Sequence, residues 1–177
     1  MGTEIKILIT SDFYAGNRID ELIQMEWYDK IFNDFLPIIQ QNDFAITNLE
    51  SALTNASTPI TKTGPAIKAT PKAIKALHYA GFKLLTLANN HIMDFGRQGL
   101  IDTIVLCKEH SIDFTGAGLN FKEASKVFYK EIKSKKLAFI NIAENEFSTT
   151  YGQEAGANPL DPVLNYYAIQ QSRSKAD

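Results

Sequence analysis

Cysteine, histidine and tryptophan are scarce in this sequence, whose 177 residues include one cysteine, three histidines and one tryptophan. The single Cys107 excludes a disulfide within the chain, and its place in a helical stretch favours a buried, unreactive thiol. A chain of this length can bury roughly two-thirds of its unfolded surface, so it needs no disulfide to form a core. With 45% hydrophobic and 21% charged residues, we expect one globular domain over residues 1–177.

The sequence also lacks a strong charge of either sign and any long apolar run. Its formal net charge is −2 and its lysines are scattered, which argues against nucleic acid as a partner. The apolar run at residues 7–9 is far shorter than a signal peptide core, and nothing approaches the ~18 apolar residues of a membrane span. The location of the native protein stays open, either cytoplasmic or exported with a signal removed.

Short apolar runs alternate with segments of helical period, which predicts parallel βαβ units with right-handed crossovers. The expected fold class is therefore α/β, with a mostly parallel sheet flanked by helices. After residue 126 the alternation gives way to a predicted hairpin around 133–135 and a weakly helical segment at 161–175. The predicted strands are 5–10, 44–47, 82–87 and 112–115, and the predicted helices are 25–40, 70–81 and 98–110.

The apolar pattern also predicts which side chains are buried. The strand at 5–10 is expected to be a buried one. In the two longer predicted helices, the side chains expected in the core are Trp27, Phe32 and Phe35 in the first, and Leu100, Ile101, Ile104 and Val105 in the second.

Polar side chains follow three successive predicted strands at the point where each strand ends. Because the carboxyl ends of parallel strands meet at one edge of a sheet, these side chains are expected to gather there. A lone strand-end Asp or Asn is more often a cap or turn former than a ligand, but three clusters at one edge favour a site. The residues are Asp12, then Asn48 and Glu50, then Asn89, Asn90, His91 and Asp94.

Oxygen and imidazole groups of this kind suit manganese, magnesium, iron or zinc. Asp12, Glu50, Asn90 and His91 offer groups of this kind, and a pair of such ions would activate water and neutralise a phosphoryl oxygen. His91, at the mouth of the sheet, is placed to donate a proton to a leaving oxygen. Asp94 either orients His91 or caps the following helix, and the sequence favours neither alternative.

A polar stretch at residues 51–62 is too long for a tight turn and is expected to form a loop at the rim of this site. A solvated lysine is the default there, but Lys62 or Lys68 could reach an anionic substrate across the rim. Asn48, Asn89 and Lys62 are accordingly the expected substrate-binding residues.

These residues form a pattern that resembles the CapA-type capsule-synthesis (poly-gamma-glutamate) family. The matching segments are Asp12, Asn48-Leu49-Glu50, Ala88-Asn89-Asn90-His91, Asp94-Phe95-Gly96-Arg97-Gln98-Gly99 and Thr115-Gly116-Ala117-Gly118. The resemblance covers nearly the whole chain, and its most specific part is the Asn-Asn-His-x-x-Asp-x-Gly run.

The family is similar in fold to calcineurin-like metallophosphoesterases, so the resemblance implies a layered α/β/β/α arrangement. It implies that Asp12, Glu50 and Asn90 are metal ligands, with Glu50 bridging two ions, and that His91 is the general acid. Because the family continues into further histidine-bearing strands, the chain is expected to be the N-terminal portion of a larger domain.

The resemblance implies a metal-dependent enzyme that acts on a phosphoester or on a capsule-related amide such as polyglutamate. The expected partners are capsule polymer or a phosphorylated small molecule, together with other capsule-synthesis proteins. The alternative is a non-catalytic scaffold or polymer-binding component of a capsule or cell-surface assembly. Tyr14 favours that alternative, because the phosphoesterases have histidine two residues after the first aspartate.

Overall fold

The computed structural model describes residues 4–177. Its helices are α1 (Arg18–Gln24), α2 (Tyr28–Phe32), the 3-10 helix η1 (Asn33–Phe35), α3 (Leu36–Gln40), α4 (Ala73–Ala80), α5 (Gly96–Glu109), α6 (Phe121–Ala124) and α7 (Pro162–Ser172). Its strands are β1 (Ile7–Phe13), β2 (Phe44–Leu49), β3 (Ala52–Leu53), β4 (Lys68–Ala69), β5 (Leu84–Thr86), β6 (Asp113–Thr115), β7 (Ala117–Gly118), β8 (Phe128–Ile132), β9 (Lys135–Phe139) and β10 (Gly156–Ala157).

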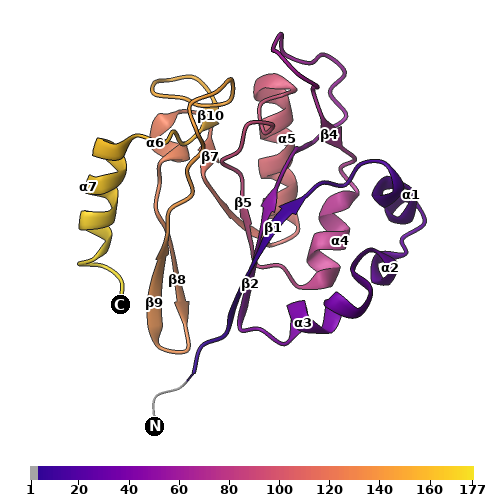
Figure 1. Cartoon of the computed structure of the whole chain (residues 1–177), viewed down its shortest axis with the longest axis horizontal. Helices are drawn as coiled ribbons and strands as arrows, with labels where there is room; N and C mark the ends of the chain where they lie inside the picture. The colour runs from indigo at the N-terminus through magenta and orange to yellow at the C-terminus, as the bar shows by residue number, and fades with distance from the viewer. Residues whose placement is uncertain (1–3) are drawn as a thin grey trace.

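The central sheet confirms the predicted parallel α/β class. Its four strands run in the order β1-β2-β5-β6, and each neighbouring pair is parallel. Figure 1 shows the strands side by side, with the helical connections to one side of them. All four strands therefore end at the same edge, as parallel pairing requires.

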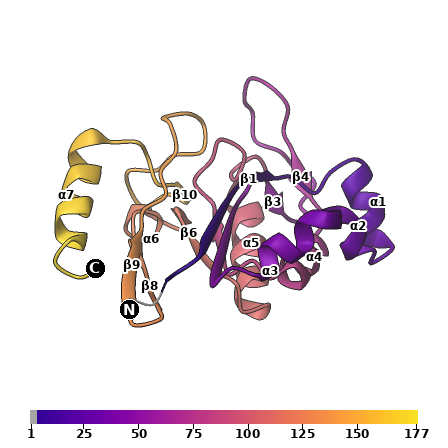
Figure 2. The same ribbon diagram turned by 60° about the horizontal axis from the view of Figure 1, so that its bottom comes forward.

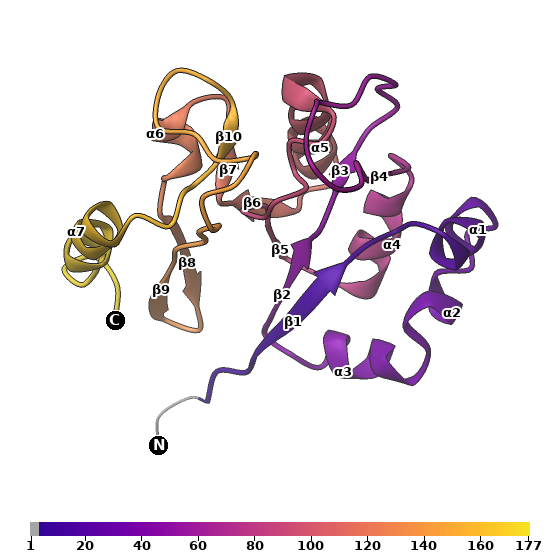
Figure 3. The same cartoon turned by 45° about the horizontal axis from the view of Figure 1, so that its top comes forward.

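Helices α1 to α5 cover one face of this sheet (Figure 3). Side chains of α4 and α5 pack there on Ala45 and Leu85, in one cluster that includes Leu77, Leu100 and Cys107. Helix α4 ends at Gly81, whose φ of 95° is the left-handed conformation that glycine adopts without a Cβ penalty. The predicted start at residue 70 was too early, because Ala73 N instead bonds to Thr70 O in a turn before the helix.

The opposite face of the sheet packs against the β8–β9 hairpin. Phe44, Ile46 and Leu84 point to this side and form a second cluster with Ile132. The hairpin is antiparallel and turns at Lys133 and Ser134, which both have positive φ. Helix α7 lies on the far side of the hairpin, so the order of layers is helices, sheet, hairpin, helix (Figures 1 and 2).

The predicted helix at 25–40 is wrong as a single element. Positive φ values at Glu26 and Asn33 end α1 and α2, and the chain continues through η1 into α3. Each break rotates the following apolar residues away from one common stripe. Trp27 is consequently 46% exposed and Phe35 39% exposed, although both were predicted to be in the core.

Two other burial predictions were also wrong. Ile9 is 71% exposed because β1 is an edge strand of the sheet rather than a buried one. In α5 the buried stripe contains Leu100, Ile104 and Cys107, and Val105 lies outside it with 44% exposure. Within residues 4–177, no helix has the length and apolarity that crossing a membrane requires.

Candidate active site

The ends of β1 and β2 bring two carboxylates to one amide. Asp12 and Asn48 are register partners in the parallel pair, and Asn48 Nδ2 donates to Asp12 Oδ1 over 2.7 Å. The same nitrogen donates to Glu50 Oε2 over 3.1 Å. Burial raises the pKa of Glu50, and the nearby Asp12 charge raises it further. Two of the three predicted metal ligands therefore share one small volume.

Asn48 and Asn89 join the second and third strand ends. Asn48 Oδ1 accepts from Asn89 Nδ2 at 3.2 Å and from Thr86 Oγ1 at 3.3 Å. Asn89 Nδ2 also donates to Leu49 O, and its Oδ1 accepts from His91 N over 3.0 Å. Both amides are thus engaged within the protein and hold the strand ends in register with His91. Substrate contact by Asn48 or Asn89 stays a prediction.

Asp94 lies against His91, the arrangement expected for the first of the two roles that the sequence left open. Asp94 is fully buried, and its Oδ2 lies 2.7 Å from His91 Nδ1. Helix α5 has Phe95 at its N-cap position, without a side-chain cap bond, so Asp94 does not cap the helix. The opposite ring nitrogen, Nε2, faces Glu50 with 3.8 Å to Oε1. A proton held at Nε2 would therefore face the two carboxylates.

The loop between β3 and β4 spans residues 54–67, so the bounds of 51–62 predicted for the rim loop were wrong: Ala52 and Leu53 are buried in β3, and the loop continues five residues further. Lys62 reaches inward from it, with 4% of its side chain exposed, and forms an ion pair with Asp94 Oδ1. Its Nζ also lies 3.2 Å from His91 Nδ1. The amine of Lys62 therefore contacts Asp94 and His91 within the protein. Direct substrate contact by Lys62 stays a prediction.

Asn90 differs from its neighbours because it is exposed, between the buried Asn89 and the half-buried His91. Within the described residues 4–177 there is no group of three or more His, Cys, Asp or Glu side chains with the spacing of a metal site. The carboxylates of Asp12 and Glu50 are a pair rather than a full ligand set. Metal binding thus stays a prediction for this chain.

The structure adds two residues that sequence reasoning missed. Thr86 is the register partner of Asn48, so its place at the third strand end could have been inferred from the same parallel alignment. Ser148 Oγ donates to Asn89 O over 2.7 Å from a loop far along the chain. No sequence pattern marks Ser148, because the contact depends on how residues 140–159 return to the sheet edge.

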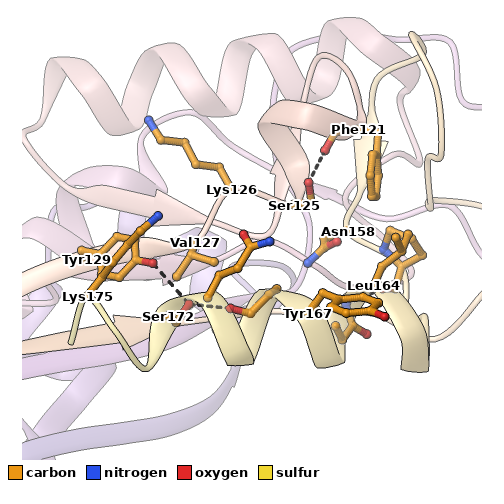
Figure 4. Close-up of a pocket in the computed structure, with 14 residues that line it drawn as sticks. Phe121, Ser125, Lys126, Val127, Tyr129, Asn158, Leu164, Tyr167, Ser172 and Lys175 are labelled. Carbon is orange, nitrogen blue, oxygen red and sulfur yellow. Dashed lines mark hydrogen bonds between the residues drawn. The ribbon is translucent and has the colours of Figure 1, made fainter. Parts of the chain in front are cut away.

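A cavity of about 470 Å³ lies elsewhere, between α7 and β8 (Figure 4). Polar groups around it bond to the protein itself: Tyr129 Oη contacts Ser172 Oγ at 3.2 Å, and Ser125 Oγ donates to Phe121 O. None of the strand-end residues described above lines it. The chemistry-bearing side chains therefore gather at the sheet edge and not in this cavity.

Comparison with known families shows which family the chain belongs to. A family model described as "Bacterial capsule synthesis protein PGA_cap" matches residues 6–176. The chain belongs to this family. The PGA_cap match includes every strand end described above and extends through α7, so the resemblance carried by the Asn-Asn-His run is confirmed over nearly the whole sequence.

Two curated members of capsule systems are similar to this PGA_cap chain. It is 28% identical over 144 residues to a capsule biosynthesis protein CapA of Bacillus anthracis, covering 80% of this chain and 35% of that protein. It is 25% identical over 171 residues to a PGA biosynthesis protein CapA of Bacillus subtilis (strain 168), covering 94% of this chain and 45% of that protein. The chain therefore spans less than half the length of these relatives.

Proposed function

We propose that this PGA_cap chain contributes to capsule synthesis through a divalent-metal-dependent site that cleaves or transfers a phosphoester or a capsule-related amide such as polyglutamate. The observation that supports it is the convergence of Asp12, Glu50 and the Asp94-oriented His91 at one sheet edge. The names of the CapA relatives support the capsule context.

The residues present fit a hard divalent cation in their chemistry. Asp12 and Glu50 both turn oxygens to the Asn48 amide nitrogen, whose hydrogens are the partial positive charge between them. Burial and, after it, the Asp12 charge raise the pKa of Glu50, and a cation would offset both. We propose that Asp12 and Glu50 hold the ion, with Asn90 and water among the other ligands. When bound, such an ion supplies a hydroxide nucleophile and neutralises charge on the substrate oxygen.

The chain's own residues would handle the proton. Asp94 accepts the Nδ1 hydrogen of His91, so the imidazole presents Nε2 towards Glu50. From that position His91, once Nε2 also carries a proton, would give that proton to the leaving oxygen or nitrogen of a substrate placed between it and the carboxylates. The frame of Asn48, Asn89 and Thr86 would keep this geometry fixed during turnover.

The test is metal-linked stabilisation followed by turnover. After treatment with EDTA, Mn²⁺ or Zn²⁺ should raise the melting temperature, and an ion at 100 times its Kd stabilises by about 2.7 kcal/mol. Asp12→Asn and Glu50→Gln should each abolish this rise, whereas Glu131→Gln, at an exposed carboxylate on β8, should keep it. Asp12→Asn and Glu50→Gln, but not Glu131→Gln, should also remove hydrolysis of a phosphodiester or a γ-glutamyl peptide by a protein of the relatives' full length. Absence of metal-linked stabilisation in that longer protein would contradict the proposal.

Tyr14 favours a second candidate, a polymer-binding scaffold without turnover. Its ring folds back over Gly16, where an added Cβ would collide with the phenol, and it lines a polar cleft with Asn17, Asp20 and Asn55. The phenol of Tyr14 is therefore turned towards this cleft, where it would contact a bound polymer. The scaffold predicts that His91→Ala retains polyglutamate in a pull-down and supports capsule formation, whereas an enzyme would lose capsule formation.

A further inference from the structure

One buried carboxylate holds both the rim loop and the imidazole of His91. Asp94 Oδ2 accepts from Ile67 N over 2.7 Å and faces His91 Nδ1, while Oδ1 pairs with Lys62. The backbone carbonyl of Asp94 also accepts from Ile60 N over 2.8 Å. Three points of the loop at 54–67 therefore meet at the residue that orients the proposed general acid.

Both partners of the Lys62–Asp94 ion pair are buried away from water. Four per cent of the lysine side chain and none of the aspartate side chain is exposed. A buried ion of either sign is costly without its partner, so each charge depends on the other being in place. The loop delivers Lys62, and the ion pair in turn fixes the loop.

Lys62 affects His91 through Asp94, whose Oδ2 lies 2.7 Å from Nδ1. An ammonium group can donate but cannot accept, so Lys62 Nζ, 3.2 Å from Nδ1, would bond to that nitrogen only in the opposite, Nε2–H tautomer. The 2.7 Å approach of Nδ1 to a carboxylate requires a proton between them. Because Asp94 also pairs with the Lys62 ammonium, the carboxylate is the acceptor and that proton belongs to Nδ1, with Nε2 on the side of Glu50.

We propose that Lys62 is a positioning residue, which latches the 54–67 loop to Asp94 and thereby holds His91 as the Nδ1–H tautomer facing the carboxylates. The use of His91 in turnover rests on the proposed function. The latch itself does not depend on that function, because it is defined by contacts among residues that are not proposed as metal ligands.

The test compares Lys62→Met, which keeps the length of the side chain without its charge, with Lys62→Arg, which restores the charge. Lys68→Met is the matched control. Lys68 also tethers this loop, through Ala56 O and the face of the Phe95 ring at 4.8 Å, but it does not touch Asp94. All measurements are made by NMR without metal.

In the unmodified chain, long-range ¹H–¹⁵N spectra should show His91 as the neutral Nδ1–H form. In Lys62→Met, amide exchange at Ile60 and Ile67 should accelerate at least about tenfold, the change expected when about 1.4 kcal/mol of local stability is lost, and the Nδ1–H signature should be lost. Lys62→Arg should recover most of both. Lys68→Met should leave the His91 spectrum unchanged.

The proposal is overturned if His91 in the unmodified chain is the Nε2–H form, a result that needs no variant. It is also overturned if Lys62→Met keeps both the spectrum and the amide protection. Should Lys62→Met fail to fold, the unmodified spectrum and Lys62→Arg decide the question. A failed metal-binding experiment with an intact Lys62 effect would overturn the proposed function and leave this latch standing.

Discussion

Asn48 and Asp12 are register partners on neighbouring parallel strands, and the amide of the first donates to the carboxylate of the second over 2.7 Å. The same amide nitrogen reaches Glu50 at 3.1 Å. One uncharged donor thus stands between two acids. The behaviour of the site without metal depends on this arrangement.

Asn48→Asp should destabilise the chain at neutral pH, because it removes the shared donor and adds a third negative charge. Hydrogen bonds to charged groups contribute about 1.5–3 kcal/mol, so a loss of about 2 kcal/mol or more is expected in urea unfolding at pH 7. At pH 4, where carboxylates begin to take up protons, the loss should shrink. Equal losses at both pH values would mean that charge repulsion is not the cause.

Glu50→Gln should stabilise the chain near pH 7, measured as a melting temperature in EDTA. The pKa of Glu50 is raised in the folded state above its ordinary value of 4.5, mainly by burial. The folded chain therefore binds this proton more tightly than the unfolded chain, so stability is highest below that value and falls as pH rises through the folded pKa. The variant removes this loss, so its advantage should grow from pH 4 to pH 7.

The control for Glu50→Gln is Glu131→Gln, which changes an exposed acid on β8. It should follow the unmodified chain at every pH. If both variants gain equally, net charge and not burial at the site explains the effect.

Cys107 should be unreactive in the folded chain. Its side chain is completely buried in α5, and burial raises the pKa of the thiol to about 12. A thiol reagent such as DTNB should therefore label Cys107 only after unfolding. Raising the pH from 7 to 9 should not produce labelling of the folded chain. Cys107→Ser should cost about 1–3 kcal/mol, because it buries a hydroxyl among apolar groups. Cys107→Ala should cost less than Cys107→Ser, and rapid labelling of the native chain would refute the assignment.

Gly116→Ala should destabilise the chain by more than about 1 kcal/mol. Gly116 has φ of 92°, and an added Cβ would collide with Asn141 Oδ1 and lie 2.9 Å from Ala88 Cβ. Asn141 Oδ1 is the acceptor for Ala88 N, so the collision also disturbs the strand end before Asn89.

Gly64→Ala separates backbone strain from collision. Gly64 has φ of 88° and open space around its missing Cβ. Gly64→Ala should introduce backbone strain without a collision, so it should lose less stability than Gly116→Ala in urea unfolding. A larger loss at Gly64 would show that the contact with Asn141 is unimportant.

The sequence by itself determined the parallel α/β class and the edge at which Asp12, Glu50 and His91 meet. Alternating strands and helices allow few topologies, and parallel pairing sends every strand end to one edge. The Asn-Asn-His run carried the resemblance to the capsule-synthesis family, and the PGA_cap match over residues 6–176 confirms that resemblance.

Tertiary structure alone decided the breaks at Glu26 and Asn33, the exposure of Trp27, and the role of Asp94. Periodicity records which residues are apolar, but not where positive φ interrupts a helix or which strand is at the edge. The sequence allowed Asp94 to cap α5 or to orient His91. Its contact with His91 spans only three residues, but its pairing with Lys62 follows from a loop that closes on it from 32 residues away in the chain. Local sequence patterns carry no record of that second contact.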